Sequence, residues 1–210
     1  EAELQPSIDV RKCKYIWLGT DLRLDAFTFL FEKNEHGIFQ VHAYPFDDDT
    51  STFIVECDEA SWKAAGLDRA STEESVAYLE KLFAKHLAGH RLLTNKSLWI
   101  NFPTIKNERW FARNVVLLGD AARTAHFSIG SGTKLAMEDA IALAKHLEAT
   151  ADLGEALRGY EAERKDASAR VQRAAQDSLL FFENVKRWYD VQSPLRFAFN
   201  LLTRSKRITY

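Results

Sequence analysis

One stretch constrains the fold more than any other: residues 115–122, with the sequence VVLLGDAA. Its four leading apolar residues, of which two are β-branched, predict a strand that is buried on both faces, as in a mostly parallel sheet. The strand ends at Gly119, and Asp120 is the first carboxylate beyond it. A carboxylate at a strand end can accept hydrogen bonds from the hydroxyl groups of a ligand.

A glycine-rich run, residues 128–133 with the sequence SIGSGT, follows a short distance later. Gly130 and Gly132 flank Ser131, and we expect a helix to begin near Thr133. The free N–H groups and the positive end of a helix favour negative charge. A strand end that carries Asp120 beside such a helix start predicts a site for a polyhydroxylated, anionic ligand.

These residues resemble the second FAD-binding motif of the single-component aromatic hydroxylases, the flavoprotein monooxygenases related to 4-hydroxybenzoate hydroxylase. In that family a Gly-Asp-Ala-Ala run precedes a Gly-x-Gly loop and a helix. The matching positions are Gly119, Asp120, Ala121, Ala122, Gly130, Gly132, Asp139 and Ala140. The departures from the family pattern are Arg123 in place of a His, His126-Phe127 in place of a Pro pair and Lys134 in place of an Asn.

The longer run 125–140 resembles a narrower branch, the hydroxylases of aromatic acyl-CoA thioesters such as salicylyl-CoA 5-hydroxylase and 2-aminobenzoyl-CoA monooxygenase. The likeness covers about residues 8–210. It implies an α/β fold, in detail an α+β fragment, with an antiparallel β substrate-binding sheet, part of an FAD-binding Rossmann-like domain and long C-terminal helices. The implied domains are a β-sheet substrate-binding domain with helices (1–105), the C-terminal part of an FAD-binding domain (106–150) and C-terminal helices (151–210).

The resemblance implies an FAD-dependent aromatic monooxygenase that uses NAD(P)H and O2 and reacts through a flavin C4a-hydroperoxide. Its acceptor would be an aromatic acyl-CoA such as salicylyl-CoA or 2-aminobenzoyl-CoA, in cytoplasmic aromatic catabolism. Two alternatives remain open. The acceptor is a free aromatic, a phenol or an indole compound, or the chain is an inactive substrate-binding and interaction module.

A pyrophosphate-binding turn of the type Gly-x-Gly-x-x-Gly does not occur in the sequence. The one Gly-x-Gly, at 130–132, follows the aspartate instead of preceding it. We therefore expect a C-terminal part of a larger protein, which needs a missing N-terminal FAD-binding segment as its partner and is inactive alone. A homodimer is a further expected partner.

Composition argues against other classes of partner. Charged residues make up 28% of the chain, the net charge is −2, and the two signs are mixed along the sequence, so neither nucleic acid nor membrane is expected. No apolar run approaches the roughly 20 residues of a membrane span. Cys13 and Cys57 lack metal-type spacing, which predicts reduced cytosolic thiols and no metal site.

The resemblance assigns the cofactor to the motif residues. By this likeness Asp120 bonds the ribityl chain, and the helix start faces the anionic end of reduced flavin. The glycines let the backbone approach the ring. Lys134 either pairs with a phosphate of the cofactor or CoA or is a solvated surface lysine. The predicted cofactor-binding set is Gly119, Asp120, Gly130, Ser131, Gly132, Thr133 and Lys134.

His126 is the catalytic candidate, because a histidine in this loop can hydrogen-bond the substrate phenol or amine. The alternative is a loop histidine bonded to the backbone. His42, Trp99 and Phe127 are the substrate-binding candidates, and His42 and Trp99 also suit structural roles. For Arg123, a surface salt bridge is preferred over contact with a phosphate or carboxylate.

Hydrophobic periodicity predicts an antiparallel meander over 13–57, with strands at 15–20, 26–32, 38–44 and 52–57. We expect Phe27, Phe29 and Phe31 to pack against helices. The face formed by Gln40, His42 and Tyr44 is then expected nearer to solvent or substrate.

Capping residues predict the remaining elements. Asp58 caps a short helix, and residues 71–74 form a capping box for the next. A strand at 98–102 is expected to stop at Pro103. Helices are expected after 133, over 154–189 and over 195–204. The first of these is expected to bury a stripe formed by Ala136, Ala140, Leu143 and Leu147.

Overall fold

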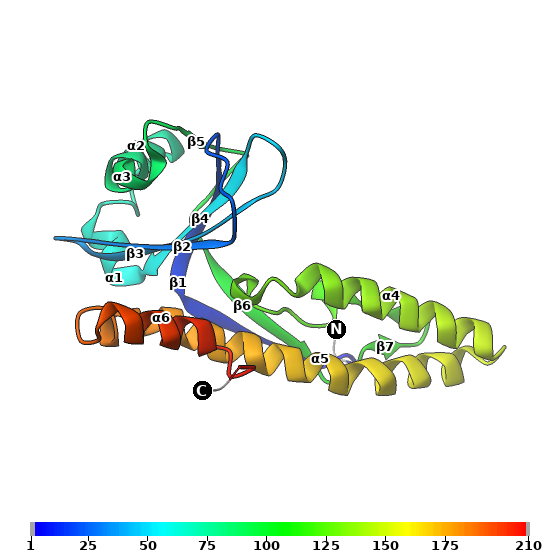
Figure 1. Cartoon of the computed structure of the whole chain (residues 1–210). Coiled ribbons are helices and arrows are strands. Elements are labelled where there is room, and N and C mark those ends of the chain that lie inside the picture. The colour runs from blue at the N-terminus through cyan, green and yellow to red at the C-terminus, as the bar shows by residue number, and fades with distance from the viewer. Residues whose placement is uncertain (1–2, 209–210) are drawn as a thin grey trace. The chain divides into compact units, whose positions relative to one another are not determined.

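The computed structural model describes residues 3–208 and divides them into two compact units, 12–102 and 3–11 with 103–208. Both are mixtures of helix and strand (Figure 1). The strands are β1 (Pro6–Thr20), β2 (Thr28–Asn34), β3 (Gly37–Pro45), β4 (Ser51–Asp58), β5 (Leu92–Leu93), β6 (Ile100–Asn107), β7 (Phe111–Ala112) and β8 (Val115–Val116). The α-helices are α1 (Glu59–Ala64), α2 (Thr72–Leu82), α3 (Ala84–Leu87), α4 (Gly132–Ala149), α5 (Leu153–Glu183) and α6 (Pro194–Thr203).

Four antiparallel strands are confirmed in the 12–102 unit, but the predicted meander is wrong for the first of them, because β1 pairs with β4 and not with β2. The strands of this unit lie in the order β2-β3-β4-β1-β5, with antiparallel pairing between neighbours, and β6 also pairs with β1. The register places Phe29 opposite His42 and Phe31 opposite Gln40. Residues that are directly opposite each other share one face of a sheet. These two phenylalanines therefore lie on the same face as His42.

The helices cover the opposite face of this sheet. Phe39, Val41 and Val55 are buried there, in one cluster with Leu79 and Phe83 of the α2–α3 segment. The prediction that the Phe27/Phe29/Phe31 face packs against helices is therefore wrong. Alternation fixes which residues share a face, but both faces of these strands carry apolar side chains, so the pattern did not reveal which one the helices cover.

Local capping signals predicted the helix starts correctly. The Asp58 side chain accepts from Ser61 N at the start of α1, at 3.0 Å. Ser71 and Glu74 form both bonds of the capping box at the start of α2. The helical segment that follows is interrupted at Phe83 and ends at Ala88, whose φ of +51° lies in the left-handed region.

The prediction that the strand stops at Pro103 is wrong, because β6 continues to Asn107. Its only partner in the described sheet is β1, so it is an edge strand. A proline on an edge strand can be accommodated because its missing N–H need not remove a ladder hydrogen bond.

The strand predicted at 115–118 is reduced to the two residues of β8, which pairs antiparallel with β7. Val115 is 53% exposed and Leu118 37% exposed. The prediction of a strand buried on both faces is therefore wrong for this structure. Burial of both faces needs neighbouring strands and covering layers, and within residues 3–208 no parallel strand lies beside β8.

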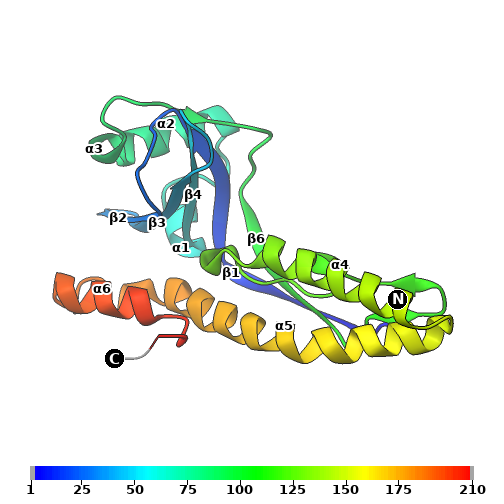
Figure 2. The same ribbon diagram turned by 45° about the vertical axis from the view of Figure 1, so that its right-hand side comes forward.

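Three helices make up most of the second unit, and α4 and α5 lie side by side in both views (Figures 1 and 2). The helix predicted over 154–189 forms as α5 but ends earlier, at Glu183, and it buries Leu157, Tyr160 and Leu179. The predicted stripe on α4 is wrong at Ala140 and Leu147, which are exposed, whereas Leu143 packs against a buried cluster. The fully buried positions are Leu135, Asp139 and Ala142. Within residues 3–208, no helix has the length and apolar character to cross a membrane.

Candidate functional site

Asp120 lies in η1 (Gly119–Ala121), a short 3₁₀ helix that packs against α4. Gly119 has a φ of +58°, and a Cβ at this position would lie 3.1 Å from the Cβ of Ala136 in α4. Glycine is therefore required here both by the backbone conformation and by the close approach to α4. The Asp120 side chain is exposed. Among the described residues it has no hydrogen-bond or ion-pair partner, so its carboxylate is available to a ligand.

The start of α4 has no side-chain cap. Ser131 occupies the N-cap position, but its hydroxyl donates to Ile129 O, 3.3 Å away. No acidic residue lies in the first turn. The first N–H groups of this helix are thus left for water or a ligand.

The backbone at Gly130 and Gly132 is open. A Cβ built at either glycine would meet no other atom within 4 Å, and Gly130 has a φ of +60°. A flat ring system can therefore approach this backbone without a steric conflict. The open backbone, the uncapped start of α4 and the exposed carboxylate of Asp120 are all features that fit an anionic, polyhydroxylated cofactor.

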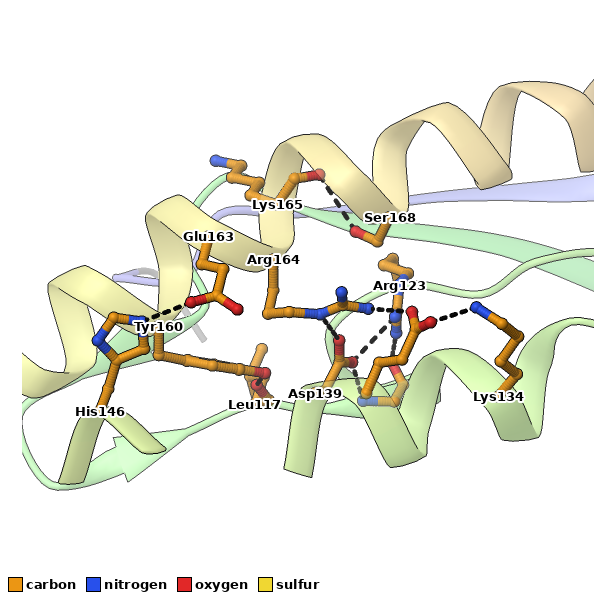
Figure 3. Close-up of polar contacts among 12 residues, drawn as sticks. Leu117, Arg123, Lys134, Asp139, His146, Tyr160, Glu163, Arg164, Lys165 and Ser168 are labelled. Atoms are coloured by element: carbon orange, nitrogen blue, oxygen red, sulfur yellow. Dashed lines mark hydrogen bonds and ion pairs between the residues drawn. The ribbon is translucent and has the colours of Figure 1, made fainter. Parts of the chain in front are cut away.

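Asp139 fixes this arrangement from inside the protein (Figure 3). Its side chain is fully buried. Its Oδ2 accepts from Gly119 N at 2.9 Å and lies 2.9 Å from Arg123 Nη2, while its Oδ1 accepts from Arg164 Nε at 2.9 Å. The turn before Asp120, the loop after it and helix α5 are thereby joined at one carboxylate.

Arg123 is the residue that departs most from its expected role. The predicted surface salt bridge is wrong, because Arg123 is only 4% exposed and its ionic partner is Asp139. Its Nη1 donates to Gly119 O at 2.6 Å, and its guanidinium lies over the ring of Trp110, 5.3 Å from the centroid. Arg123 therefore braces both polar groups of the Gly119 backbone, one directly and one through Asp139.

Further charged side chains lie next to Arg123 and Asp139. Arg164 Nη2 donates to Glu138 Oε2 at 2.8 Å, and Lys134 bonds the other oxygen of Glu138. The bonds from Lys134 and Arg164 hold the pKa of Glu138 below its usual range. Lys134 itself is exposed and paired with Glu138, which fits the alternative of a surface lysine. Burial and the charge of Asp139 raise the pKa of the neighbouring Tyr160, whose hydroxyl donates to Leu117 O at 2.9 Å.

His126 is buried in the loop between Asp120 and α4. Its Nδ1 lies 2.8 Å from Ser128 Oγ, and that hydroxyl lies 2.7 Å from Ser178 Oγ in α5. Arg204 donates from Nε to Ser178 Oγ at 2.9 Å and from Nη2 to Ser128 O at 2.7 Å. Burial lowers the pKa of Arg204 to about 10. The ring of His126 packs against Phe127, with 4.1 Å between centroids, so these two candidates are neighbours.

The 12–102 unit contains the other candidates. His42 is buried, with Nε2 3.0 Å from Glu56 Oε2 and its ring edge-on to Phe29. We call the sheet face that carries these side chains the His42 face. Trp99 packs against the core on the side of the helices, and its indole N–H donates to Ser75 Oγ at 3.2 Å. These contacts are structural, and the predicted contact of Trp99 with substrate stays a prediction from the sequence.

Sequence reasoning missed the partners that hold the site. No role was predicted for Arg164 or Glu56, because each stands in an ordinary amphipathic or alternating pattern. One signal was present: Asp139 belongs to the family motif and interrupts an apolar helix face. An acidic residue on a buried face requires a cationic or N–H partner. Arg123, which replaces the His of the family motif, is a cation close to it in the sequence motif.

Comparison with known proteins identifies the family. The family model described as FAD binding domain matches residues 17–175. Salicyloyl-CoA 5-hydroxylase of a Streptomyces species is 46% identical over 210 residues, which cover 95% of this chain and 41% of that protein. The 3-hydroxy-4-methyl-anthranilyl-[aryl-carrier protein] 5-monooxygenase of Streptosporangium sibiricum is 45% identical over 168 residues, covering 80% and 44%. The chain thus spans less than half the length of these relatives.

The fold also matches a solved structure, that of Pseudomonas aeruginosa PqsL in complex with 2-aminobenzoylacetate. The TM-score is 0.62 at 25% identity, over 87% of this chain and 53% of the other. The similarity in sequence and the similarity in fold both point to an FAD-dependent enzyme, and the open backbone near Asp120 fits that cofactor.

Proposed function

This chain belongs to the FAD-binding-domain family of FAD-dependent aromatic hydroxylases, and we propose that it supplies the flavin-facing and substrate-facing parts of an aromatic monooxygenase that acts on an aryl thioester. Bound FAD would supply the redox chemistry, by taking reducing equivalents from NAD(P)H and activating O2. The residues described above would position the cofactor and the acceptor ring.

The observation that carries this proposal is the exposed carboxylate of Asp120, held beside the uncapped start of α4. Asp120 would accept hydrogen bonds from ribityl hydroxyls. The N–H groups at 132–134 would hold the negative charge of the reduced ring, where a helix start contributes roughly 0.3–1 kcal/mol at an exposed site and up to about 2 kcal/mol when partly buried. Gly130 and Gly132 admit the ring without steric conflict.

Each unit offers one proposed acceptor-facing group, His126 in the 103–208 unit and His42 in the 12–102 unit. His126 is held in orientation by Ser128, so that it can bond the phenol or amine of the acceptor and keep the ring electron-rich. His42 is held in the same way by Glu56. Phe127 provides an aromatic surface next to His126.

An aryl thioester is preferred as the acceptor because two relatives of 45–46% identity have names that specify a CoA-linked or a carrier-protein-linked aromatic. A free aromatic is the second candidate. It is favoured by the similarity to PqsL, whose structure holds 2-aminobenzoylacetate, although the identity is only 25%.

The proposal is tested by titrating FAD with the purified chain and following flavin fluorescence. Asp120→Ala is expected to weaken FAD binding at least tenfold, because hydrogen bonds to a charged group contribute about 1.5–3 kcal/mol. Asp166→Ala is the matched control, since Asp166 is an exposed carboxylate on α5 without a partner among the described residues. Equal affinities for the native chain and Asp120→Ala would contradict the proposed cofactor site.

A further inference from the structure

The 12–102 unit contains a pocket of about 590 Å³ at the edge of its sheet, outside the residues assigned above. β1 and β5 contribute to its walls, together with the loop 94–98 and Ile100 at the start of β6. This volume lies within the range of roughly 300–1,000 Å³ that is typical of small-molecule sites. A single acceptor ring fills only part of such a space.

The walls of the pocket are mainly apolar and open to solvent. Trp17, Leu98 and Ile100 all line it and are 44%, 66% and 46% exposed. Exposed apolar side chains that gather around one hollow, as these do, mark a binding surface more often than isolated ones. Thr94 and Asn95 add hydroxyl and amide groups to the same wall. The lining therefore suits a ligand that combines alkyl segments with amides.

Part of the pocket wall lies on the His42 face. Tyr15 lines the pocket and stands directly opposite Glu56 in the β1–β4 register. Glu56 in turn contacts His42. Burial, together with the charge of Glu56, raises the pKa of Tyr15, which agrees with their proximity. The pocket wall at Tyr15 is thus linked through Glu56 to the proposed acceptor-facing histidine.

The lining of the pocket includes a cation. Lys96 lines the pocket, is exposed and has no ion-pair partner among the described residues. Its φ of +51° places it in the left-handed region, which is uncommon for a residue other than glycine. An exposed ammonium group without a counter-charge in the lining of an apolar pocket favours a ligand with an anionic end.

We propose that this pocket holds the phosphopantetheine arm of an aromatic acyl thioester. The ring lies towards His42, the amide-containing arm runs past Trp17 and Leu98, and the phosphate meets Lys96 at the mouth. The inference rests on the proposed function for the identity of the ring. CoA and an acylated carrier protein present the same arm, so the shared chemistry is the arm itself.

The test is calorimetric binding to the full chain of four ligands: salicylate, salicyloyl-pantetheine, salicyloyl-CoA and a salicyloyl carrier protein. Both small thioesters are expected to bind at least tenfold more tightly than salicylate. Lys96→Ala is expected to weaken salicyloyl-CoA by about fivefold, as for an exposed charge pair, and to leave salicyloyl-pantetheine, which lacks the phosphate, unchanged. Leu98→Asp is expected to weaken both small thioesters at least tenfold and salicylate not at all.

Two controls match these variants. Lys85→Ala removes an exposed charge from α3 outside the pocket, and Val191→Asp adds a carboxylate at a site that is 79% exposed in the other unit. Both should bind like the native chain. Tighter binding of the carrier protein than of salicyloyl-CoA identifies the carrier as the source of the arm, and the reverse identifies CoA.

The inference is overturned if salicylate binds as tightly as its thioesters, or if Leu98→Asp has no effect on them. Its failure is distinguishable from failure of the proposed function. If Lys96→Ala and Leu98→Asp weaken thioester binding while Asp120→Ala leaves FAD affinity unchanged, the pocket is supported and the flavin site is rejected.

Discussion

The backbone N–H of Gly119 donates to the carboxylate of Asp139, 20 positions further along the chain, over 2.9 Å. This bond ties the turn that carries Asp120 to the middle of α4. Arg123 reinforces it from the other side by bonding Gly119 O. The backbone position of Asp120 is thus held by buried groups, and its exposed carboxylate is left to a ligand.

Replacing Asp139 by Asn should lower the free energy of unfolding by about 3–5 kcal/mol, because two buried guanidinium groups lose their shared counter-charge. Urea denaturation followed by circular dichroism measures this change. Glu163→Gln, which breaks exposed pairs to Lys145 and His146, should cost less than about 1 kcal/mol. A loss below about 1 kcal/mol for Asp139→Asn would show that the buried pair contributes little.

Arg123→Lys should destabilise the chain although it keeps the charge. A lysine ammonium cannot reproduce the forked geometry with which Arg123 reaches both Gly119 O and Asp139. Loss of one such bond corresponds to about 1.5–3 kcal/mol, measurable as a lower urea midpoint. Arg158→Lys, at an exposed position of α5, should stay within about 0.5 kcal/mol of the native chain.

Gly130→Ala should weaken FAD binding at least fivefold, because its methyl group would occupy the open space above the backbone. The substitution also forces an alanine to a φ of +60°, which costs about 1–2 kcal/mol. Gly66→Ala separates the two effects, since Gly66 has a φ of +72° and equally open surroundings in the other unit. Similar stability losses in both variants, with a loss of flavin affinity only at Gly130, are expected; equal flavin affinities would contradict the site.

Stability should fall on acidification in part through Glu138. Because the folded chain lowers the pKa of this group, its carboxylate binds protons less readily there than in the unfolded chain. Its stabilising contribution is therefore fully present above its unfolded pKa, near 4.5, and is lost as the pH falls through the lower folded value. Urea midpoints at pH 7 and pH 3.5 should differ less for Glu138→Gln than for the native chain, and an identical difference would argue against this role.

Features set by neighbouring residues were predictable from the sequence. The capping box at Ser71 and Glu74 and the cap at Asp58 depend on groups three residues apart, and both form as expected. The neighbouring positions of β2, β3 and β4 follow from alternation and short turns, whereas the position of β1 beside β4 does not. The family motif likewise identified the turn at Asp120 and the helix that begins at Gly132.

Features set by partners far along the chain were not predictable in this way. The side of the sheet that the helices cover depends on how α2 and α3 return to Phe39 and Val41. The buried face of α4 includes Asp139 because Arg123 and Arg164 neutralise it, and a periodic pattern of apolar residues would exclude an aspartate from that face. Pro103 interrupts no ladder because β6 lies at an edge, which only the pairing reveals.

The strand pair β1–β6 has a further consequence. The side chain of Asn101 donates to Cys13 O at 3.1 Å and accepts from Lys14 Nζ. These bonds hold the first and last residues of the 12–102 unit side by side, although Cys13 and Asn101 are 88 positions apart. A module whose two joints adjoin can be exchanged between homologues as a cassette, with both splices falling within one ladder. Transplanting it would reveal how much of the acceptor preference travels with the cassette.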